Sequence, residues 1–375
     1  ALFTLKINFK NGFLPGSSPA DMFSRCLRSS STLFRRTALR SISSAPINPV
    51  ITVIDGDGIG PELMDSVSGV LAAADVPVTL QRFSGPEELD VDEVIISLST
   101  NGVGLKGPLH TPVRGLTPSR NLKIRKALGL YANIVPIKSV PGIKTRHSDV
   151  DFVVIRENTE GEYSGLEHNV APGVVQSLKV ITRTASMRIA RHAFEYAQEN
   201  GRQKVTAIHK ANIQKLSDGE FLHCCRAVAD EFSGIEYNEM IIDNASMQMV
   251  MNPQQFDVVL TPNLYGAILQ NIGSGLVGGP GILPGSNVGP RGHAVFESGT
   301  RHVGLDISGK NITNPIGTLL TSVMMLRHLK LNSHATKIET AVFDTITDNK
   351  VRTPDIGGTN STREFTKAVI DKLSQ

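Results

Sequence analysis

The sequence of 375 residues contains no tryptophan, only 5% aromatic residues and three cysteines. It also lacks any apolar run of about 18 residues, so no segment is expected to span a membrane. Cys26, Cys224 and Cys225 are too few for a disulfide framework and lack zinc-site spacing, and we expect the adjacent pair to be buried in a helix. The remaining composition, 40% hydrophobic and 19% charged, predicts a large core divided between two lobes.

The positive charge of the chain is concentrated at its N-terminus. Residues 1–46 contain seven basic residues and one acidic residue, a balance of +6, which leaves −3 for the rest of a chain whose net charge is +3. The basic charge is therefore no evidence for binding to nucleic acid. Residues 22–46 are rich in arginine and serine, contain no acidic residue and are interleaved with apolar side chains. This composition is typical of a mitochondrial transit peptide, although a disordered basic tail is the alternative.

We therefore expect translation to begin at Met22, residues 1–46 to lie outside the fold, and the mature chain to reside in the mitochondrial matrix. From Val50 onward, β-branched apolar runs alternate with amphipathic segments, which predicts an α/β fold with a mostly parallel sheet. The clearest predicted strands are 50–54, 152–155, 205–208 and 257–261, and the clearest helices are 63–73, 187–198, 219–232, 338–346 and 362–373.

The glycine-rich loop Gly56-Asp-Gly-Ile-Gly60 superficially matches a dinucleotide-binding loop. However, no acidic residue follows it in the ribose-binding context, so a tight turn is favoured over a Rossmann fold.

A helix near residue 263 has the spacing of a metal site but not its ligands. Pro262 opens this helix after a buried strand, and Ala267 and Asn271 lie four residues apart, on one helix face. Asp243 follows another strand-like run. Three carboxylates at these positions would suit Mg²⁺ or Mn²⁺, whereas one aspartate with an alanine and an asparagine is a poor metal site.

Four motifs occur in a fixed order along the chain: Ile54-Asp-Gly-Asp-Gly-Ile-Gly-Pro-Glu62, Arg156-Glu-Asn-Thr-Glu-Gly-Glu-Tyr-Ser164, His209-Lys-Ala-Asn212 and Asn263-Leu-Tyr-Gly266. Together they resemble the isocitrate and isopropylmalate dehydrogenases over residues 48–375. The resemblance implies a two-domain fold, with a large domain of 47–130 and 278–375 and a small domain of 131–277 that carries the subunit interface. Members of this family oxidise and decarboxylate 2-hydroxy acids with NAD(P) and a divalent metal.

Two further stretches, 243–248 and 301–310, resemble the regulatory subunits of the mitochondrial NAD-dependent isocitrate dehydrogenases. Catalytic members have metal-binding aspartates where this chain has Ala267 and Asn271, and an arginine where it has Val135. The resemblance therefore implies a chain that is inactive alone. It would act in a hetero-oligomer with a catalytic subunit that uses NAD and Mg²⁺ or Mn²⁺ in the citric acid cycle.

The same resemblance implies three groups of site residues. Ser119, Asn121, Arg125 and Arg156 would bind citrate, since guanidinium groups suit carboxylates, although interdomain ion pairs are the alternative for the two arginines. Arg301, His302, Asp306, Ile307 and Asn314 would bind AMP or ADP beside a flexible stretch from Gly273 to Gly289, although an unused groove is the alternative. Tyr163 and Lys210 match the proton-transfer residues, with Lys210 and Asp243 reaching into the partner's site.

The predicted function is thus that of an allosteric subunit of NAD-dependent isocitrate dehydrogenase, with neither a membrane nor nucleic acid as its primary partner. One alternative is an independent dehydrogenase with a relaxed metal geometry, which an intact aspartate pair would have supported. The other is a binding protein, for example for RNA, that no longer takes part in the enzyme complex. No basic patch studded with aromatic residues supports it.

Overall fold

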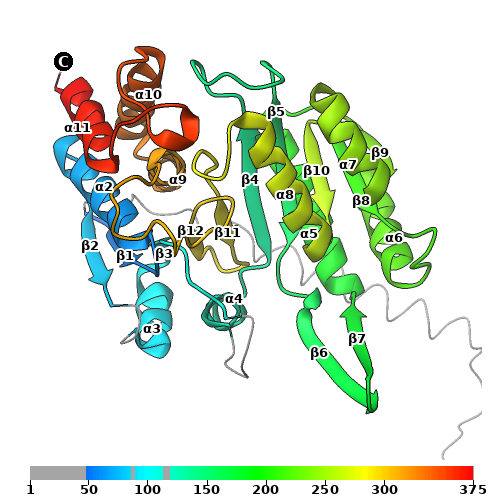
Figure 1. The fold of residues 1–375 in the computed structure, drawn as a ribbon. Helices are drawn as coiled ribbons and strands as arrows, with labels where there is room; N and C mark the ends of the chain where they lie inside the picture. The colour runs from blue at the N-terminus through cyan, green and yellow to red at the C-terminus, as the bar shows by residue number, and fades with distance from the viewer. Residues whose placement is uncertain (1–47, 86–88, 113–118, 375) are drawn as a thin grey trace, which may run out of the picture. The chain divides into compact units, whose positions relative to one another are not determined.

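The computed structural model describes residues 48–85, 89–112 and 119–374, so the predicted transit peptide lies outside the described residues. A ten-stranded sheet carries helices on both faces, and a two-stranded hairpin extends from it (Figure 1). The strands are β1 Val50–Ile54, β2 Thr79–Phe83, β3 Val103–Lys106, β4 Ala132–Lys138, β5 Asp151–Glu157, β6 Gly161–Ala171, β7 Val174–Val180, β8 Lys204–His209, β9 Glu236–Ile241, β10 Val258–Thr261, β11 Ser286–Val288 and β12 Ala294–Phe296. The α-helices are α2 Gly60–Ala73, α3 Val91–Asn101, α4 Arg120–Leu128, α5 Arg183–Glu199, α6 Ser217–Ala229, α7 Ile242–Met251, α8 Asn263–Val277, α9 Ile316–His328, α10 Asn332–Thr347 and α11 Thr362–Leu373.

The sheet has the order β2-β1-β3-β12-β11-β4-β5-β10-β8-β9. The strand pairs toward both ends of the sheet are parallel, and only the central pairs β12–β11, β11–β4 and β4–β5 are antiparallel. The short connection between β11 and β12 forces a hairpin, because parallel strands need a longer crossover. The predicted α/β class and mostly parallel sheet are confirmed.

Strand β5 is apolar throughout its centre because helices cover both faces of the sheet around it. Phe152 and Val154 pack in one core cluster with α7 and α8, whereas Val153 and Ile155 pack in another with α5 and α6. Successive side chains of a strand point to opposite faces, so a strand buried on both sides cannot alternate polar and apolar residues.

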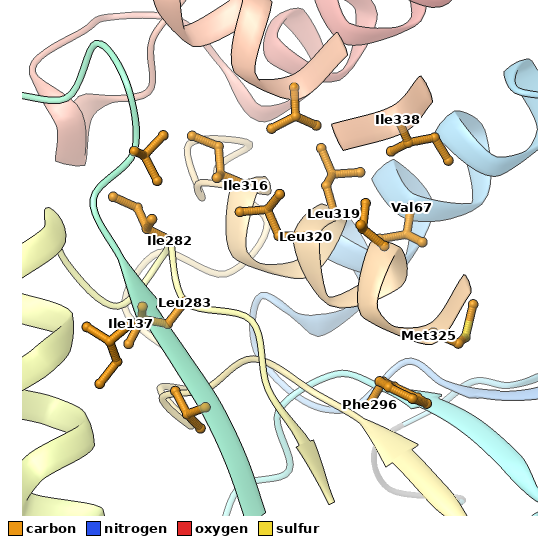
Figure 2. Packing of buried hydrophobic residues seen from close by; sticks show 14 of the residues in the cluster. Val67, Ile137, Ile282, Leu283, Phe296, Ile316, Leu319, Leu320, Met325 and Ile338 are labelled. Atoms are coloured by element: carbon orange, nitrogen blue, oxygen red, sulfur yellow. The ribbon is translucent and has the colours of Figure 1, made fainter. Parts of the chain in front are cut away.

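The first of these clusters extends far beyond α7 and α8. Figure 2 shows Val67 of α2, Leu319 of α9 and Ile338 of α10 packed together, with Ile137 of β4 and Leu283 nearby. A third cluster lies under α3 and α4. The predicted division into 47–130 plus 278–375 and 131–277 stays a prediction, since one sheet runs across those boundaries. Within the described residues, no helix is long and apolar enough to cross a membrane.

The glycine-rich loop after β1 is the predicted tight turn. Gly58 has a φ of +57°, and a Cβ there would overlap with the backbone oxygen of Val303. Glycine is therefore required both for the left-handed conformation and for this close approach.

Arg156 lies within β5 and Tyr163 lies within β6. One local prediction is wrong. The stretch from Gly273 to Gly289 is not uniformly flexible, because it includes the end of α8 and all of β11. Gly273 is buried in α8 against Ile137, so that glycine serves close packing between a helix and a strand.

Candidate functional site

A polar cavity of about 530 Å³ opens between α4, α8 and the segment 299–303. Its volume falls within the roughly 300–1,000 Å³ of typical small-molecule sites. The lining includes the four residues predicted to bind citrate, Tyr163, both altered helix positions and two of the residues predicted to bind a nucleotide: Ser119, Asn121, Arg125, Arg156, Tyr163, Ala267, Asn271, Arg301 and His302. The fold thus brings together residues that lie more than 180 positions apart in the sequence. We refer to this space as the anion cavity.

Helix α4 places three of the lining residues. Ser119 is its N-cap, and the hydroxyl accepts a hydrogen bond from the backbone N–H of Leu122 at 3.4 Å. The amide nitrogen of Asn121 donates to the carbonyl oxygen of Leu109 at 2.9 Å, which ties the first turn of the helix to the loop after β3. Arg125 follows on the buried side of the same helix. Capping therefore fixes the start of α4, and the helix geometry carries Arg125 to the cavity wall.

Arg156 is held by neutral amides rather than by a carboxylate. The side-chain oxygen of Asn263 accepts from Nε at 2.9 Å and from Nη2 at 2.6 Å, and Gln270 accepts from Nη1 at 3.3 Å. The guanidinium carbon also lies 4.9 Å from the centre of the Tyr163 ring. Asn263 and Gln270 belong to α8, so this helix orients the arginine without neutralising its charge.

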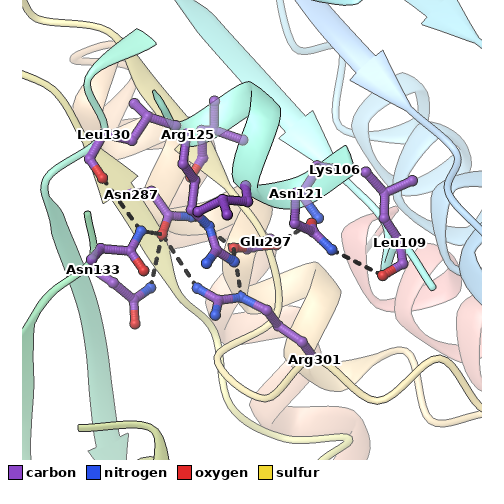
Figure 3. A network of polar contacts seen from close by, with 12 residues as sticks. Lys106, Leu109, Asn121, Arg125, Leu130, Asn133, Asn287, Glu297 and Arg301 are labelled. Carbon is purple, nitrogen blue, oxygen red and sulfur yellow. Dashed lines mark hydrogen bonds and ion pairs between the residues drawn. The ribbon is translucent and has the colours of Figure 1, made fainter. Parts of the chain in front are cut away.

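A single buried carboxylate, Glu297, organises the remaining cations (Figure 3). It pairs with Lys106 at 2.6 Å, with Arg301 at 2.9 Å and with Arg125 at 3.7 Å, and it accepts a hydrogen bond from Asn287 at 2.8 Å. Burial opposes ionisation of Glu297, but Arg301 and Lys106 outweigh it and hold its pKa well below the usual range. Sequence reasoning missed Lys106 and Glu297. The available signal was their position at the ends of the apolar strands β3 and β12.

The wall of the anion cavity thus has more positive than negative charge. Burial, followed by repulsion from Arg301, lowers the pKa of Arg125 to about 9 and that of Arg156 to about 10. Both groups remain cationic at neutral pH. Because desolvated cations without a full set of counterions are stabilised by an anion, the cavity favours a ligand with several carboxylates.

Arg301 supplies positive charge to the anion cavity, although Val135 stands where a cationic side chain was expected. Val135 is fully buried in β4, and it faces Gly299 so closely that a Cβ on Gly299 would lie 2.7 Å from the Cγ1 atom of Val135. Val135 stands where catalytic members of the family that the chain resembles have an arginine, but the cavity has not simply lost a cation. Arg301, predicted to bind a nucleotide, also lines the anion cavity and supplies a guanidinium there.

A second, more apolar cavity of about 170 Å³ adjoins the first and shares Thr300, Arg301 and His302 with it. Ile307 and Asn314 line this second cavity, whereas Asp306 is exposed and lies outside both linings. The Asn314 amide nitrogen donates to Asp355 and its oxygen accepts from the Ile316 backbone, each at 2.9 Å. Four of the five residues predicted to bind a nucleotide therefore meet here, and Asp306 does not.

The two altered positions of α8 face the anion cavity without a carboxylate. The Asn271 side chain donates to the carbonyl oxygen of Ala267 at 2.9 Å, and its oxygen lies 3.1 Å from Nε2 of His302. Among the described residues, no group of three or more histidine, cysteine, aspartate or glutamate side chains is arranged to hold a metal ion. The residues present therefore do not fit a divalent metal bound by this chain alone.

Lys210 and Asp243 lie outside the lining of both cavities and pair with each other at 2.9 Å. Lys210 follows β8, and Asp243 is in the first turn of α7, with 69% of its side chain exposed. Tyr163 thus lines the anion cavity, whereas Lys210, which was assigned to the partner's site, does not. Ile241, not Asp243, occupies the N-cap position of α7.

Residues 50–369 match the profile of the isocitrate/isopropylmalate dehydrogenase family. The chain is 57% identical to a regulatory chain of mitochondrial isocitrate dehydrogenase [NAD] from Dictyostelium discoideum, over 87% of this chain and 91% of that protein. It is 50% identical to isocitrate dehydrogenase [NAD] catalytic subunit 5, mitochondrial, of Arabidopsis thaliana, over 88% of this chain and 90% of that protein. Isocitrate dehydrogenase from Methylococcus capsulatus has a similar crystal structure, with a TM-score of 0.84 and 40% identity over 87% of this chain and all of that one.

Both named relatives are mitochondrial, which confirms the predicted mitochondrial location, whereas the matrix and the cleavage of residues 22–46 stay predictions. The fold expected from the four motifs is also confirmed. By its sequence profile and by its fold, the chain belongs to the isocitrate/isopropylmalate dehydrogenase family.

Proposed function

We propose that the chain is a regulatory, non-catalytic subunit of a mitochondrial NAD-dependent isocitrate dehydrogenase complex. That complex converts isocitrate and NAD to 2-oxoglutarate, carbon dioxide and NADH in the citric acid cycle. One observation carries the proposal: the face of α8 that borders the anion cavity bears Ala267 and Asn271 and no carboxylate. A metal ion supplies the Lewis acid for this chemistry, and this chain has no ligand set for it within its described residues.

The anion cavity is proposed to bind citrate as an allosteric ligand. Arg125, Arg156 and Arg301 line it, and two of them, Arg125 and Arg301, share the single carboxylate of Glu297. A tricarboxylate would satisfy these guanidinium groups by charge-assisted hydrogen bonds. Ser119 and Asn121 add neutral polar contacts at the start of α4.

The adjoining apolar cavity is proposed to bind the adenine ring of AMP or ADP. Its volume of about 170 Å³ is below the range of complete small-molecule sites, so the phosphate groups would extend along the shared segment toward Arg301 and His302. Asn314 retains one amide hydrogen for the base after its bond to Asp355. Asp306 would reach the ribose only if the loop around it moved toward the cavity.

The partner is proposed to be a catalytic subunit of the same fold. The hairpin β6–β7 pairs with no other strand of the described chain, and an isolated hairpin is marginally stable in water. Figure 1 shows this hairpin projecting from the sheet. Exposed apolar side chains gather on the hairpin, on α7 and α8, and after Lys210: Leu166, Val170, Val174, Val175, Leu178, Met247, Val250, Met251, Ile268, Ile213 and Leu216. Burial of so many apolar side chains would stabilise an obligate interface.

Lys210 and Asp243 are proposed to act in the partner's site rather than in this chain's own cavity. Their ion pair is close in sequence to the exposed apolar residues of the 213–216 turn and of α7. Lys210 would serve there as a cation for proton transfer, and Asp243 as one carboxylate of the partner's metal site. NAD and the metal ion would then belong to the catalytic subunit.

Replacement of Arg125 by alanine should weaken citrate binding to the assembled complex by about tenfold or more. A charge-assisted hydrogen bond contributes roughly 1.5–3 kcal/mol, and Arg125 is a buried guanidinium on the cavity wall. Titration calorimetry on the intact complex measures the affinity directly.

Lys123→Ala provides a matched control, because Lys123 lies on the same helix but pairs with Asp92 outside the cavity. Citrate affinity should be unchanged in this variant. If Arg125→Ala and Lys123→Ala both bound citrate as the unmodified complex does, the assignment of the anion cavity to citrate would be wrong.

Residues 22–46, fused to a reporter, should direct it to the mitochondrial matrix and be removed there. The five arginines of this segment occur without an acidic residue, and a positively charged amphipathic segment is what import recognises. Fractionation and the mass of the recovered reporter provide the measurement. A reporter that remained cytosolic and uncleaved would contradict the prediction, and a fusion with all five arginines replaced by glutamine is the control.

A further inference from the structure

Asp218 is a fully buried carboxylate that the proposed chemistry does not use. It lies in the first turn of α6, and its two oxygens have three donors from three different elements. Oδ1 accepts from Nζ of Lys179 on β7 at 2.6 Å. Oδ2 accepts from the phenol of Tyr265 on α8 at 3.0 Å and from the backbone N–H of Lys210 at 2.6 Å. One side chain therefore links the hairpin, α8 and the turn that carries Lys210.

Lys179 and Tyr265, the two side chains that donate to Asp218, also contact each other. Nζ of Lys179 lies 3.1 Å from the Tyr265 hydroxyl and 4.4 Å from the centre of its ring. Burial opposes protonation of Lys179, but hydrogen bonds to Asp218 and Tyr265 outweigh it and raise its pKa. Burial also raises the pKa of Tyr265, so its phenol keeps its proton and donates to the carboxylate. The cluster is thus fully paired and well defined in geometry.

The backbone of Lys210 is fixed on both sides. Its N–H donates to Asp218, and its carbonyl oxygen accepts from the backbone N–H groups of Ile213 and Gln214, each at 2.9 Å. Only the lysine side chain remains adjustable, and it extends to Asp243. The direction in which Lys210 leaves the sheet is therefore set by its contact with Asp218.

From these contacts we infer that Asp218 is a positioning residue that holds Lys210 in the orientation needed to reach the partner's active site. The inference rests on the proposed role of Lys210 in that site. Since Asp218 is also bound to Lys179 at the end of the hairpin, the same carboxylate joins the proposed assembly surface to the lysine. Asp218 itself touches neither substrate nor cofactor.

Asp218→Asn, introduced into this chain and assembled with the catalytic subunit, should lower kcat roughly tenfold to a hundredfold with little change in KM. An asparagine retains the size of the side chain but has a single acceptor oxygen. It therefore loses either the contact with Lys179 or the contacts with Tyr265 and the Lys210 N–H, and the cluster that fixes the Lys210 turn is disrupted. A misplacement of about 1 Å can cost on the order of a hundredfold in rate. The pH profile of kcat should shift toward that of Lys210→Met, and the double variant should be no slower than Lys210→Met alone.

Asp257→Asn is the matched control. Asp257 accepts the backbone N–H groups of Gln203 at 2.6 Å and Lys204 at 3.0 Å, and it pairs with Arg202, so it anchors the start of β8 as Asp218 anchors its end. This variant should lose some thermal stability and keep a normal kcat and pH profile. If Asp218→Asn prevented assembly, Tyr265→Phe, which removes the donor to Asp218 and the acceptor for Lys179 but keeps the carboxylate, should still lower kcat several-fold.

The outcomes separate the two proposals. If Lys210→Met left turnover of the complex unchanged, the role of Lys210 in the partner's site would be wrong, and the inference about Asp218 would fall with it. If Lys210→Met abolished turnover while the Asp218 and Tyr265 variants matched the Asp257 control, only the positioning role would be overturned. A double variant much slower than Lys210→Met would likewise contradict it, because Asp218 would then act through something other than Lys210.

Discussion

The mature chain purified alone should show essentially no oxidation of isocitrate with NAD and Mg²⁺. Electrostatic stabilisation by a metal ion commonly contributes several kcal/mol to lowering the barrier, and this chain has Ala267 and Asn271 where the cavity would need carboxylates. Formation of NADH, followed by absorbance, measures the rate. The same preparation mixed with the catalytic subunit is the positive control, since it shows that the chain is folded and competent for assembly.

Restoring both aspartates, as Ala267→Asp with Asn271→Asp, should not rescue the isolated chain. Val135 is buried against Gly299 where an arginine is expected, so the substrate site also lacks a group from β4. The segment 301–310, which resembles that of the regulatory subunits, is also unchanged in this double variant. Robust turnover by the unmodified chain would contradict the regulatory assignment and favour an independent dehydrogenase.

Asp243→Asn in this chain should reduce turnover of the assembled complex severely, although the chain is not catalytic. If Asp243 contributes a carboxylate to the partner's metal site, the amide replaces an anionic ligand with a neutral one and weakens metal binding. The dependence of activity on Mg²⁺ concentration should then shift to higher concentrations. Assembly should remain intact, because the Asp243 side chain is mostly exposed and its ion pair is with Lys210 of the same chain.

Asp92→Asn is a closely matched control for this experiment. Asp92 and Asp243 are both the second residue of a helix, with side chains 70% and 69% exposed, and each pairs with a lysine, at 2.8 and 2.9 Å. A carboxylate near a helix N-terminus stabilises the helix in either position. If Asp243 did no more than that, both variants would lose a little thermal stability and keep normal kinetics. An unshifted metal dependence with normal turnover in Asp243→Asn would support this simpler role.

The sequence predicted the family, the fold class and the altered metal positions because each depends on local order. The four motifs are short and contiguous, and the spacing of Ala267 and Asn271 follows from the periodicity of one helix. The predicted strand at 50–54 and the predicted helix at 362–373 have the same bounds in the structure. An apolar run marks the strand, and a capping serine followed by helical periodicity marks the helix. The buried pair Cys224 and Cys225 was predicted for the same reason.

Only the tertiary structure decided how charges are shared. Glu297 and Arg301 share one segment, whereas Lys106 and Arg125 come from two others, and nothing in their local sequence indicates that one carboxylate meets three cations. The same holds for Asp218, which looks like an ordinary first-turn helix acid in the sequence but accepts donors from β7, α8 and the Lys210 turn. Sequence alone determined which residues are present and which are replaced. The three-dimensional fold determined which of them lie within hydrogen-bond distance, because such contacts depend on how distant strands and helices pack rather than on the periodicity of any one of them.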